Sequence, residues 1–185
     1  TWVIDPLDGT TNFARGLPIW GVSVALLCDG EPMVGLLSFV SLREQYSSIR
    51  GNGATVNGKL LRTSPVKRAD DQHFLMQCTR TPKRYRVTSP LKPRILGSAA
   101  YHLAAVASGS ALAGIESTPK LWDIAAALLI LSEAGGCYRS LDGRQSIFPL
   151  ETTAMNYERT SFPIIAAANQ AILSELESHI AKHRQ

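Results

Sequence analysis

The chain has 185 residues, of which 45% are hydrophobic and 18% charged, and its formal net charge is +4. This composition is typical of a globular protein and excludes an intrinsically disordered chain, which would be poorer in apolar residues. No apolar run approaches the roughly 20 residues that a membrane helix needs, and the three cysteines form no CxxC pair, so we expect no membrane span, no zinc site and a reducing cytoplasm.

The first half of the chain predicts an antiparallel meander of strands. Apolar and β-branched runs flank Asp29-Gly30, a pair that favours a tight hairpin turn, and further turns are expected at 51–53 and at Asn57-Gly58. Residues 5–12 are expected to form a turn-rich loop. Strands are expected at 1–4, 21–28, 33–40, 45–50, 59–62 and 73–78.

The second half predicts alternating helices and strands. Three prolines argue against a helix or a central strand at 82–93. Helices are expected at 99–108, at 121–134, where Gly135-Gly136 suits the end, and at 170–183, where Asn169 suits the start. Strands are expected at 111–115, 137–141 and 164–168. The predicted fold class is α+β, a single domain built as a layered α/β sandwich, with a meander in 1–80 and a mixed α/β half in 94–185.

Two carboxylates three residues apart mark the most informative segment, at 5–12. Asp5 and Asp8 follow an apolar strand, Pro6 stiffens the backbone between them, and Gly9 lets another group approach closely. Such a segment can bind a hard cation and, through following amides, an anion. For an isolated DxxDG segment, a strand-to-turn connection in which Asp8 merely caps a helix would be the favoured interpretation.

A second acidic position lies far downstream, at Leu121-Trp122-Asp123. Asp123 falls in the first turn of the predicted helix, where the helix dipole favours a carboxylate, so a capping role and a ligand role both fit. However, the strings 2–13 and 121–127, followed by Glu133-Ala134-Gly135-Gly136, resemble the two signatures of the inositol monophosphatase family in the family's order. Ala127 stands where the family often has glycine.

This resemblance implies the sugar-phosphatase type of fold and hydrolysis of a phosphate monoester by a water that Mg²⁺ activates. In that family Asp5, the Leu7 carbonyl, Asp8 and Asp123 would be metal ligands. Asp8 and Thr10 would be catalytic, Thr10 by holding the phosphate or the attacking water. The phosphate and the rest of the substrate would contact Gly9, Thr10, Gly97, Ser98, Ala99, Glu116 and Asp123. For Glu116, an exposed loop carboxylate is an equal alternative.

The resemblance also implies features that would precede the first residue given. The family's N-terminal helices, a metal-bridging glutamate and an aspartate that acts through the threonine would lie upstream of Thr1. We therefore expect this chain, taken as it stands, to bind metal weakly and to turn over little substrate. The family is commonly homodimeric, so a homodimer is the expected assembly.

Several alternatives stay open from the sequence. The substrate could be an inositol phosphate, histidinol phosphate, fructose 1,6-bisphosphate or a 3′-phosphoadenosine nucleotide. The basic stretch 62–94 fits a solvated loop first, steering of phosphates second and nucleic acid a distant third. A non-catalytic binder of phosphate or polyanions is the rival function. The four histidines form no catalytic pattern and are interpreted as structural or surface residues, and the cysteines as small buried hydrophobes.

Overall fold

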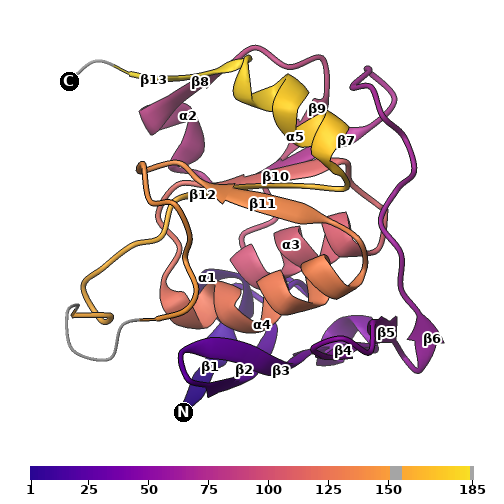
Figure 1. The fold of residues 1–185 in the computed structure, drawn as a ribbon, viewed down its shortest axis with the longest axis vertical. Helices are drawn as coiled ribbons and strands as arrows, with labels where there is room; N and C mark the ends of the chain where they lie inside the picture. The colour runs from indigo at the N-terminus through magenta and orange to yellow at the C-terminus, as the bar shows by residue number, and fades with distance from the viewer. Residues whose placement is uncertain (151–155, 184–185) are drawn as a thin grey trace.

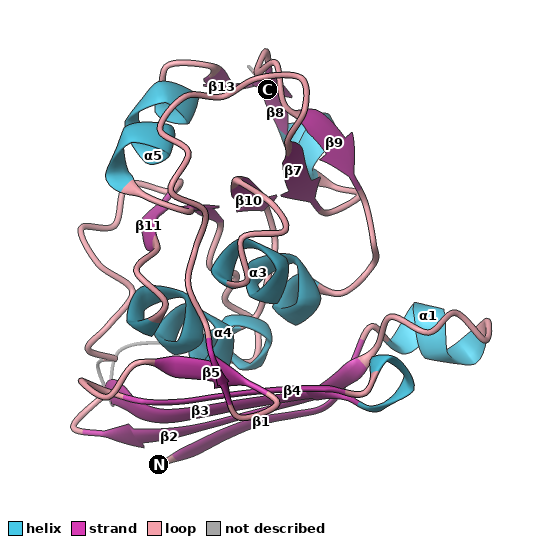
Figure 2. Cartoon of the chain, turned by 90° about the vertical axis from the view of Figure 1, so that its right-hand side faces the viewer, coloured by secondary structure: helices cyan, strands magenta, loops and turns pink. Residues whose placement is uncertain are grey.

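A computed structural model describes residues 1–150 and 156–183 of the chain. Two sheets lie in separate layers, with helices α3 (Ala99–Ala107) and α4 (Leu121–Glu133) between them and helix α5 (Gln170–Glu177) beyond the second sheet (Figures 1 and 2). The layers alternate as sheet, helices, sheet and helix, which confirms the layered α+β sandwich.

The first sheet is the predicted antiparallel meander, with its six strands in sequence order. The Asp29-Gly30 turn has positive φ at both residues, as a tight hairpin between right-twisted strands requires. One expectation was wrong: the supposed loop at 5–12 is divided between the end of the first strand, at 5–8, and a short helix, α1 (Thr10–Ala14). The strands are β1 (Trp2–Asp8), β2 (Gly21–Cys28), β3 (Glu31–Phe39), β4 (Glu44–Ile49), β5 (Ala54–Val56) and β6 (Lys59–Leu60), with a 3-10 turn, η1 (Val40–Leu42), between β3 and β4.

The second sheet is mixed, in the order β11-β12-β10-β7-β9. Its strands are β7 (Phe74–Gln77), β9 (Lys92–Arg94), β10 (Ala113–Glu116), β11 (Cys137–Ser140) and β12 (Ile164–Ala167). β10 pairs parallel with β7 and antiparallel with β12. Because β7 belongs to this sheet, the sheets do not divide at the expected boundary near residue 80.

Helix α4 lies at the centre of the hydrophobic core. Its residues from Ile124 to Leu131 are at most 5% exposed, so it is apolar on all sides, as a helix between two sheets must be. It packs closely on β3, where a Cβ at Gly35 would come within 2.9 Å of the Ala126 carbonyl oxygen. The same core cluster includes residues of both sheets.

Two segments differ from the sequence predictions. A single helical turn, α2 (Thr81–Arg84), begins the proline-rich stretch, because Pro82 occupies the first turn, where no backbone N–H is needed. The expected helix at 170–183 ends at Glu177, and the chain then forms β13 (Ile180–Lys182), which pairs with β8 (Tyr85–Val87). Pairing with a distant strand therefore overrides local helix propensity. Asn169 caps α5 as expected, accepting from the Ile172 amide at 3.2 Å.

The outer face of the first sheet carries exposed apolar side chains. Trp2 is 61% exposed, Ile4 53% and Ile49 53%. An exposed apolar area of this kind is typical of surfaces that bind another protein segment. Within the described residues, no helix is long and apolar enough to cross a membrane.

Candidate functional site

Three aspartates from distant parts of the sequence converge at one end of the first sheet. Single carboxylate oxygens of Asp5, Asp8 and Asp123 all lie within 4.8 Å of one another. Residues three apart on a regular strand point to opposite faces. Here β1 has a bulge: Asp5 pairs with Ser23 and Asp8 with Gly21, so three steps on β1 match two on β2. Because of this extra residue, the side chains of Asp5 and Asp8 can both approach Asp123.

The third aspartate is brought in by the start of α4. Asp123 lies in the first turn of this helix, as predicted, and accepts a hydrogen bond from the Lys120 amide at 2.7 Å. The Ser23 hydroxyl, on the strand opposite Asp5, donates to the Trp122 carbonyl at 3.0 Å. One side chain therefore fixes the first turn of α4 beside β1.

Helix α3 holds the most buried member of the cluster. Asp8 is 8% exposed, and one of its oxygens accepts from the Ser98 hydroxyl and from the Ala100 amide at 3.0 Å. Ser98 is also the N-cap of α3, since its hydroxyl oxygen accepts from the Tyr101 amide at 3.0 Å. Asp8 therefore meets the amide end of a helix, which favours a negative charge there.

Crowding and burial make these carboxyls hard to ionise without a cation. Burial, together with the smaller effect of the nearby Asp8 and Asp5 charges, raises the pKa of Asp123 to about 7, against the opposing hydrogen bond from the Lys120 amide. Burial also raises the pKa of Asp8, although its bonds to Ser98 and Ala100 act in the opposite direction. Like charges held this close need shared protons or a bound cation.

Asp123, one of the three aspartates, lines a cavity of about 390 Å³. All seven predicted substrate residues line it, as do several that the sequence did not single out. The lining includes Gly9, Thr10, Gly97, Ser98, Ala99, Glu116 and Asp123, and also Thr11, Cys78, Thr79, Arg80, His102, Thr118 and Pro119. Asp5, Leu7 and Asp8 are absent from this lining, although Asp5 and Asp8 lie beside Asp123. The Leu7 carbonyl oxygen accepts from the Thr10 hydroxyl at 3.2 Å. Ser98 is 2% exposed, with its hydroxyl directed at Asp8.

Glycines allow the loops around the cavity to approach closely. Gly9 has a φ of +81°, and a Cβ there would lie 2.8 Å from the Ile19 carbonyl oxygen. Gly97 has a φ of +80°, and a Cβ there would lie 2.7 Å from the Asn12 side chain. Buried Asn12 donates to the Ile19 and Leu96 carbonyls at 2.6 and 2.7 Å, which ties the two loops together. In the sequence, Asn12 stood out only as part of a signature string.

For Glu116, the structure overturns one of the two sequence interpretations. This residue is not an exposed loop carboxylate: it ends β10 and is 2% exposed. The His102 Nδ1 atom lies 2.5 Å from its Oε1 atom, and His102 is 1% exposed. A lone histidine on an alanine-rich helix gave no sequence signal for this pairing.

The cysteines are less buried than expected. Cys28 is exposed, and Cys78 and Cys137 are half-buried. The Cys78 sulfur lies 3.3 Å from the Thr81 hydroxyl and 3.2 Å from the Ser117 hydroxyl, at the edge of the cavity. It is a polar contact in the wall of the site rather than a filler of the core.

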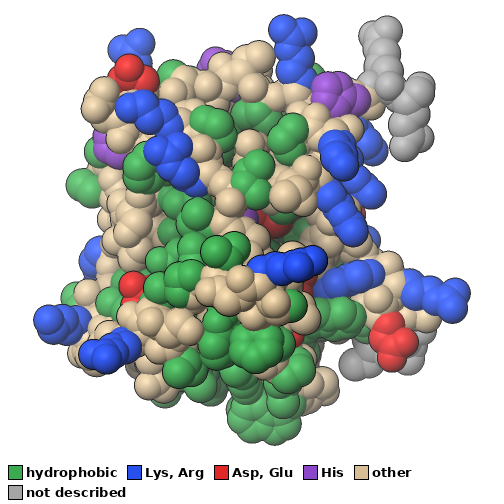
Figure 3. Space-filling model, turned by 180° about the vertical axis from the view of Figure 1, so that it is seen from behind, with side chains coloured by type: hydrophobic (Ala, Val, Ile, Leu, Met, Phe, Trp, Pro, Cys, Tyr) green, Lys and Arg blue, Asp and Glu red, His purple; other side chains and the backbone are tan. Residues whose placement is uncertain are grey.

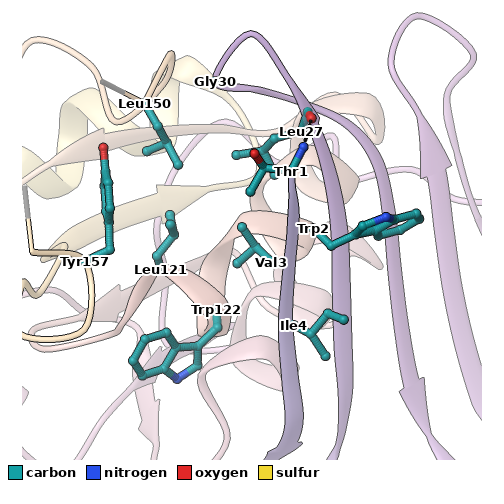
Figure 4. Close-up of a pocket in the computed structure, with 10 residues that line it drawn as sticks. All are labelled: Thr1, Trp2, Val3, Ile4, Leu27, Gly30, Leu121, Trp122, Leu150 and Tyr157. Atoms are coloured by element: carbon teal, nitrogen blue, oxygen red, sulfur yellow. Dashed lines mark hydrogen bonds between the residues drawn. The ribbon is translucent and has the colours of Figure 1, made fainter. Parts of the chain in front are cut away.

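A second cavity, of about 450 Å³, lies along the open edge of β1 and is more apolar. Figure 4 shows Val3, Leu27, Leu121 and Leu150 pointing into it, with Trp2 turned away. Among the described residues that line it, no side chain is a carboxyl, histidine, lysine or arginine. The smaller cavity, next to the three aspartates, is therefore the better candidate for metal chemistry.

Comparison with known families decides the relationship. The family model described as the inositol monophosphatase family matches residues 1–184. The chain belongs to the inositol monophosphatase family. It is 35% identical over 161 residues to an inositol-1-monophosphatase of Mesorhizobium japonicum, and 34% identical over 158 residues to a histidinol-phosphatase of Chlorobaculum parvum. Each alignment covers 79% of this chain and 59% of the relative, so the chain spans less than two thirds of these family members.

Solved structures of the family share the fold. The extragenic suppressor protein SuhB of Bartonella henselae superimposes with a TM-score of 0.80 at 30% identity, covering 96% of this chain and 67% of that one. The family membership and the layered fold expected from the two signature strings are thereby confirmed.

Proposed function

We propose that this chain is the catalytic part of a Mg²⁺-dependent phosphate monoester hydrolase of the inositol monophosphatase type. The observation that carries the proposal is the convergence of Asp5, Asp8 and Asp123 beside a cavity. The cavity of about 390 Å³ falls in the range of small-molecule sites and suits a ligand of sugar size. Membership of a phosphatase family supports the same chemistry.

The donor set fits Mg²⁺. All three side chains offer oxygen, which hard divalent cations prefer, and no thiol or imidazole belongs to the cluster. Burial is the largest cause of the raised pKa of both Asp8 and Asp123, and their negative charges add to it, so a bound cation would favour the ionised carboxylates. Asp5, Asp8 and Asp123 would hold the ion, and the Leu7 carbonyl is the further ligand that the resemblance implies. When bound, Mg²⁺ supplies charge stabilisation and lowers the pKa of a coordinated water.

The protein's own residues position the reactants. Ser98 and the Ala100 amide fix the orientation of Asp8, and Lys120 fixes that of Asp123. We assign the phosphate to the side of the cavity at Gly9 and Thr10, and the organic part of the substrate to the side at Ala99 and Glu116. Thr10 would orient the water or the phosphate once its hydroxyl leaves the Leu7 carbonyl.

The proposal extends to assembly and location. We propose that 1–185 acts as one catalytic unit, since residues of both sheets share one core cluster. We propose a homodimer, which the exposed apolar face of the first sheet supports with Trp2, Ile4 and Ile49. We propose a cytoplasmic location, which three free thiols support.

The experiment that tests this function measures phosphate release and metal binding together. We would assay inositol 1-phosphate and the other candidate substrates with and without Mg²⁺, using this chain and the chain with any residues that its gene encodes before Thr1. Asp5→Asn should abolish release and the Mg²⁺-induced rise in Tm, whereas Asp29→Asn, the same change in an exposed hairpin turn, should leave both unchanged. Activity that survives Asp5→Asn would overturn the proposal.

The rival function is a non-catalytic binder of polyanions. The basic residues of the stretch 62–94 that motivated it are all exposed, which suits a solvated surface as well as a binding one. Figure 3 shows Lys and Arg side chains spread around the edges of the rear face, on both sides of an apolar middle. Binding of RNA that weakens with salt but ignores both Mg²⁺ and Asp5→Asn would favour the rival.

A further inference from the structure

The cavity has two chemically different sides. On one side lie the aspartates at the end of β1 and the start of α4, where the proposed function places the phosphate. The other side is formed by the carboxyl ends of β7 and β10, which are parallel neighbours and therefore end together. The cavity lining at these strand ends consists of residues 78–80, after β7, and of Glu116, Thr118 and Pro119, at and after the end of β10. The organic part of a substrate faces this second side.

A positively charged side chain, that of Arg80, lies on this second side of the cavity. Among the described residues that line the cavity, Arg80 is the one lysine or arginine. It is exposed, and no described residue forms an ion pair with it. Its Nη1 atom donates to the Thr118 hydroxyl at 3.3 Å. The guanidinium therefore keeps further N–H donors for an anion.

The backbone that carries Arg80 is fixed to β10. The Thr81 side chain is fully buried and donates to the Ile115 carbonyl at 3.0 Å. Cys78 lies 3.2 Å from the Ser117 hydroxyl, and the Cys78 amide donates to the Ile115 carbonyl at 3.4 Å. The residues on both sides of the short segment 79–80 are thus held in place. The backbone of Arg80 is therefore positioned before a ligand binds, which lowers the entropy cost of binding.

Nearby cations are used elsewhere. The Lys120 ammonium donates to the carbonyls of Glu158 and Arg159, both at 2.9 Å. The Arg94 guanidinium lies 4.4 Å from the centre of the Phe74 ring and donates to the Pro93 carbonyl. Arg80 is therefore the cation that remains available at the cavity.

We propose that Arg80, with the hydroxyls of Thr79 and Thr118, forms a subsite for a second anionic group on the substrate, a phosphate or a carboxylate. The proposal rests on the proposed function, because it takes the aspartate side as the place of the scissile phosphate. Guanidinium groups match the geometry of phosphate and carboxylate oxygens. Monoesters with a second anionic group are therefore preferred over neutral polyol phosphates, and amino-alcohol phosphates such as histidinol phosphate bind most weakly.

Equilibrium binding tests this without depending on turnover. We would titrate the full chain calorimetrically with fructose 1,6-bisphosphate, inositol 1-phosphate and histidinol phosphate in the presence of Ca²⁺ or Mg²⁺. We expect the bisphosphate to bind about tenfold more tightly than inositol 1-phosphate, as one charge-assisted contact at an exposed position allows. Arg80→Gln should reduce this ratio to about one, and Arg80→Lys should retain part of it.

Matched controls separate this subsite from general charge and from the proposed function. Arg84→Gln removes the same charge from an exposed residue of α2 outside the cavity lining and should leave the ratio unchanged. A ratio that Arg80→Gln leaves intact, or that Arg84→Gln reduces equally, overturns the subsite alone. If the unsubstituted chain binds none of the three esters, or if Asp123→Asn binds them equally well, the proposed function fails, and the subsite fails with it.

Discussion

The His102 Nδ1 atom lies 2.5 Å from Glu116 Oε1, while its Nε2 atom accepts from the Leu96 amide at 2.9 Å. Because Nε2 accepts a hydrogen bond, it carries no proton, so the ring is neutral and its proton lies on Nδ1. Burial lowers the pKa of His102 to about 4. The contact is therefore a hydrogen bond from a neutral imidazole to Glu116, rather than an ion pair.

We first predict that His102→Phe destabilises the fold. Phenylalanine fills the space, but it leaves the Leu96 amide and the Glu116 carboxyl without their partner, at a cost of about 2–4 kcal/mol. Urea unfolding measures the loss. His73→Phe, at a half-buried histidine that pairs with the exposed side chain of Asp70, should cost less than about 1 kcal/mol. Equal losses for the two variants would contradict this account of His102.

We next predict that Glu116 makes stability depend on pH. Burial, and then the Asp8 charge, raise the pKa of Glu116 to about 8, against an opposing hydrogen bond from Cys78. The native state therefore holds a proton that the unfolded state releases near its ordinary value of 4.5. Stability from this group is complete below 4.5 and is lost as pH rises through about 8. Glu116→Gln should flatten the fall in unfolding free energy between about pH 5 and pH 8, measured in EDTA, and an unchanged slope would refute it.

For the metal cluster, we predict opposite effects of Asp123→Asn with and without Mg²⁺. Without metal, the variant removes a buried like charge while keeping an oxygen that can accept from Lys120, so stability at pH 8 should rise by about 1 kcal/mol. With Mg²⁺ at saturating concentration, the native chain should gain Tm and the variant should gain much less. Thermal unfolding in EDTA and in Mg²⁺ distinguishes the two effects. A variant that is less stable in EDTA would contradict the like-charge explanation.

Alanine substitutions of two N-cap residues, Ser98 and Asn169, should show that Ser98 supports Asp8 in addition to capping its helix. Ser98→Ala and Asn169→Ala each remove a side chain that accepts from a helix amide, and each should cost about 1 kcal/mol. Only Ser98 also donates to Asp8. We therefore expect Ser98→Ala alone to weaken Mg²⁺ affinity, by about tenfold in calorimetric titration. Equal Mg²⁺ affinity in the two variants would show that Asp8 needs no such support.

Alanine substitutions at Gly9 and Gly16 should distinguish the stability cost of backbone strain from the cost of close packing. Gly9 and Gly16 both have positive φ, but a Cβ at Gly9 would lie 2.8 Å from the Ile19 carbonyl oxygen, whereas a Cβ at Gly16 would meet nothing within 4 Å. Gly16→Ala should cost about 1–2 kcal/mol from backbone strain alone. Gly9→Ala should cost about 1–3 kcal/mol more, because the loop must shift. Chemical denaturation measures both, and equal costs would mean that the loop gives way freely.

By itself, the sequence determined most elements whose signal is local. The strands at 21–28 and 45–50, the Asp29-Gly30 hairpin and the helix that begins beside Asp123 follow from hydrophobic pattern and turn residues, which act over a few positions. The two signature strings also identified the family and the three aspartates. Prediction was wrong at 5–8 and 178–182, where strand pairing with residues far along the chain outweighs local propensity.

Only the tertiary structure decided how these residues act together. The β1 bulge that turns Asp5 and Asp8 toward Asp123 depends on the register with β2. The contacts of Asp8 with Ser98, of His102 with Glu116 and of Arg80 with Thr118 join positions that are 90, 14 and 38 residues apart. Such pairings carry no periodic signal, because they arise from the packing of α3 and α4 between two sheets. The sequence therefore specified the reactive groups, whereas the packed fold gave each its burial, its partner and its place in the cavity.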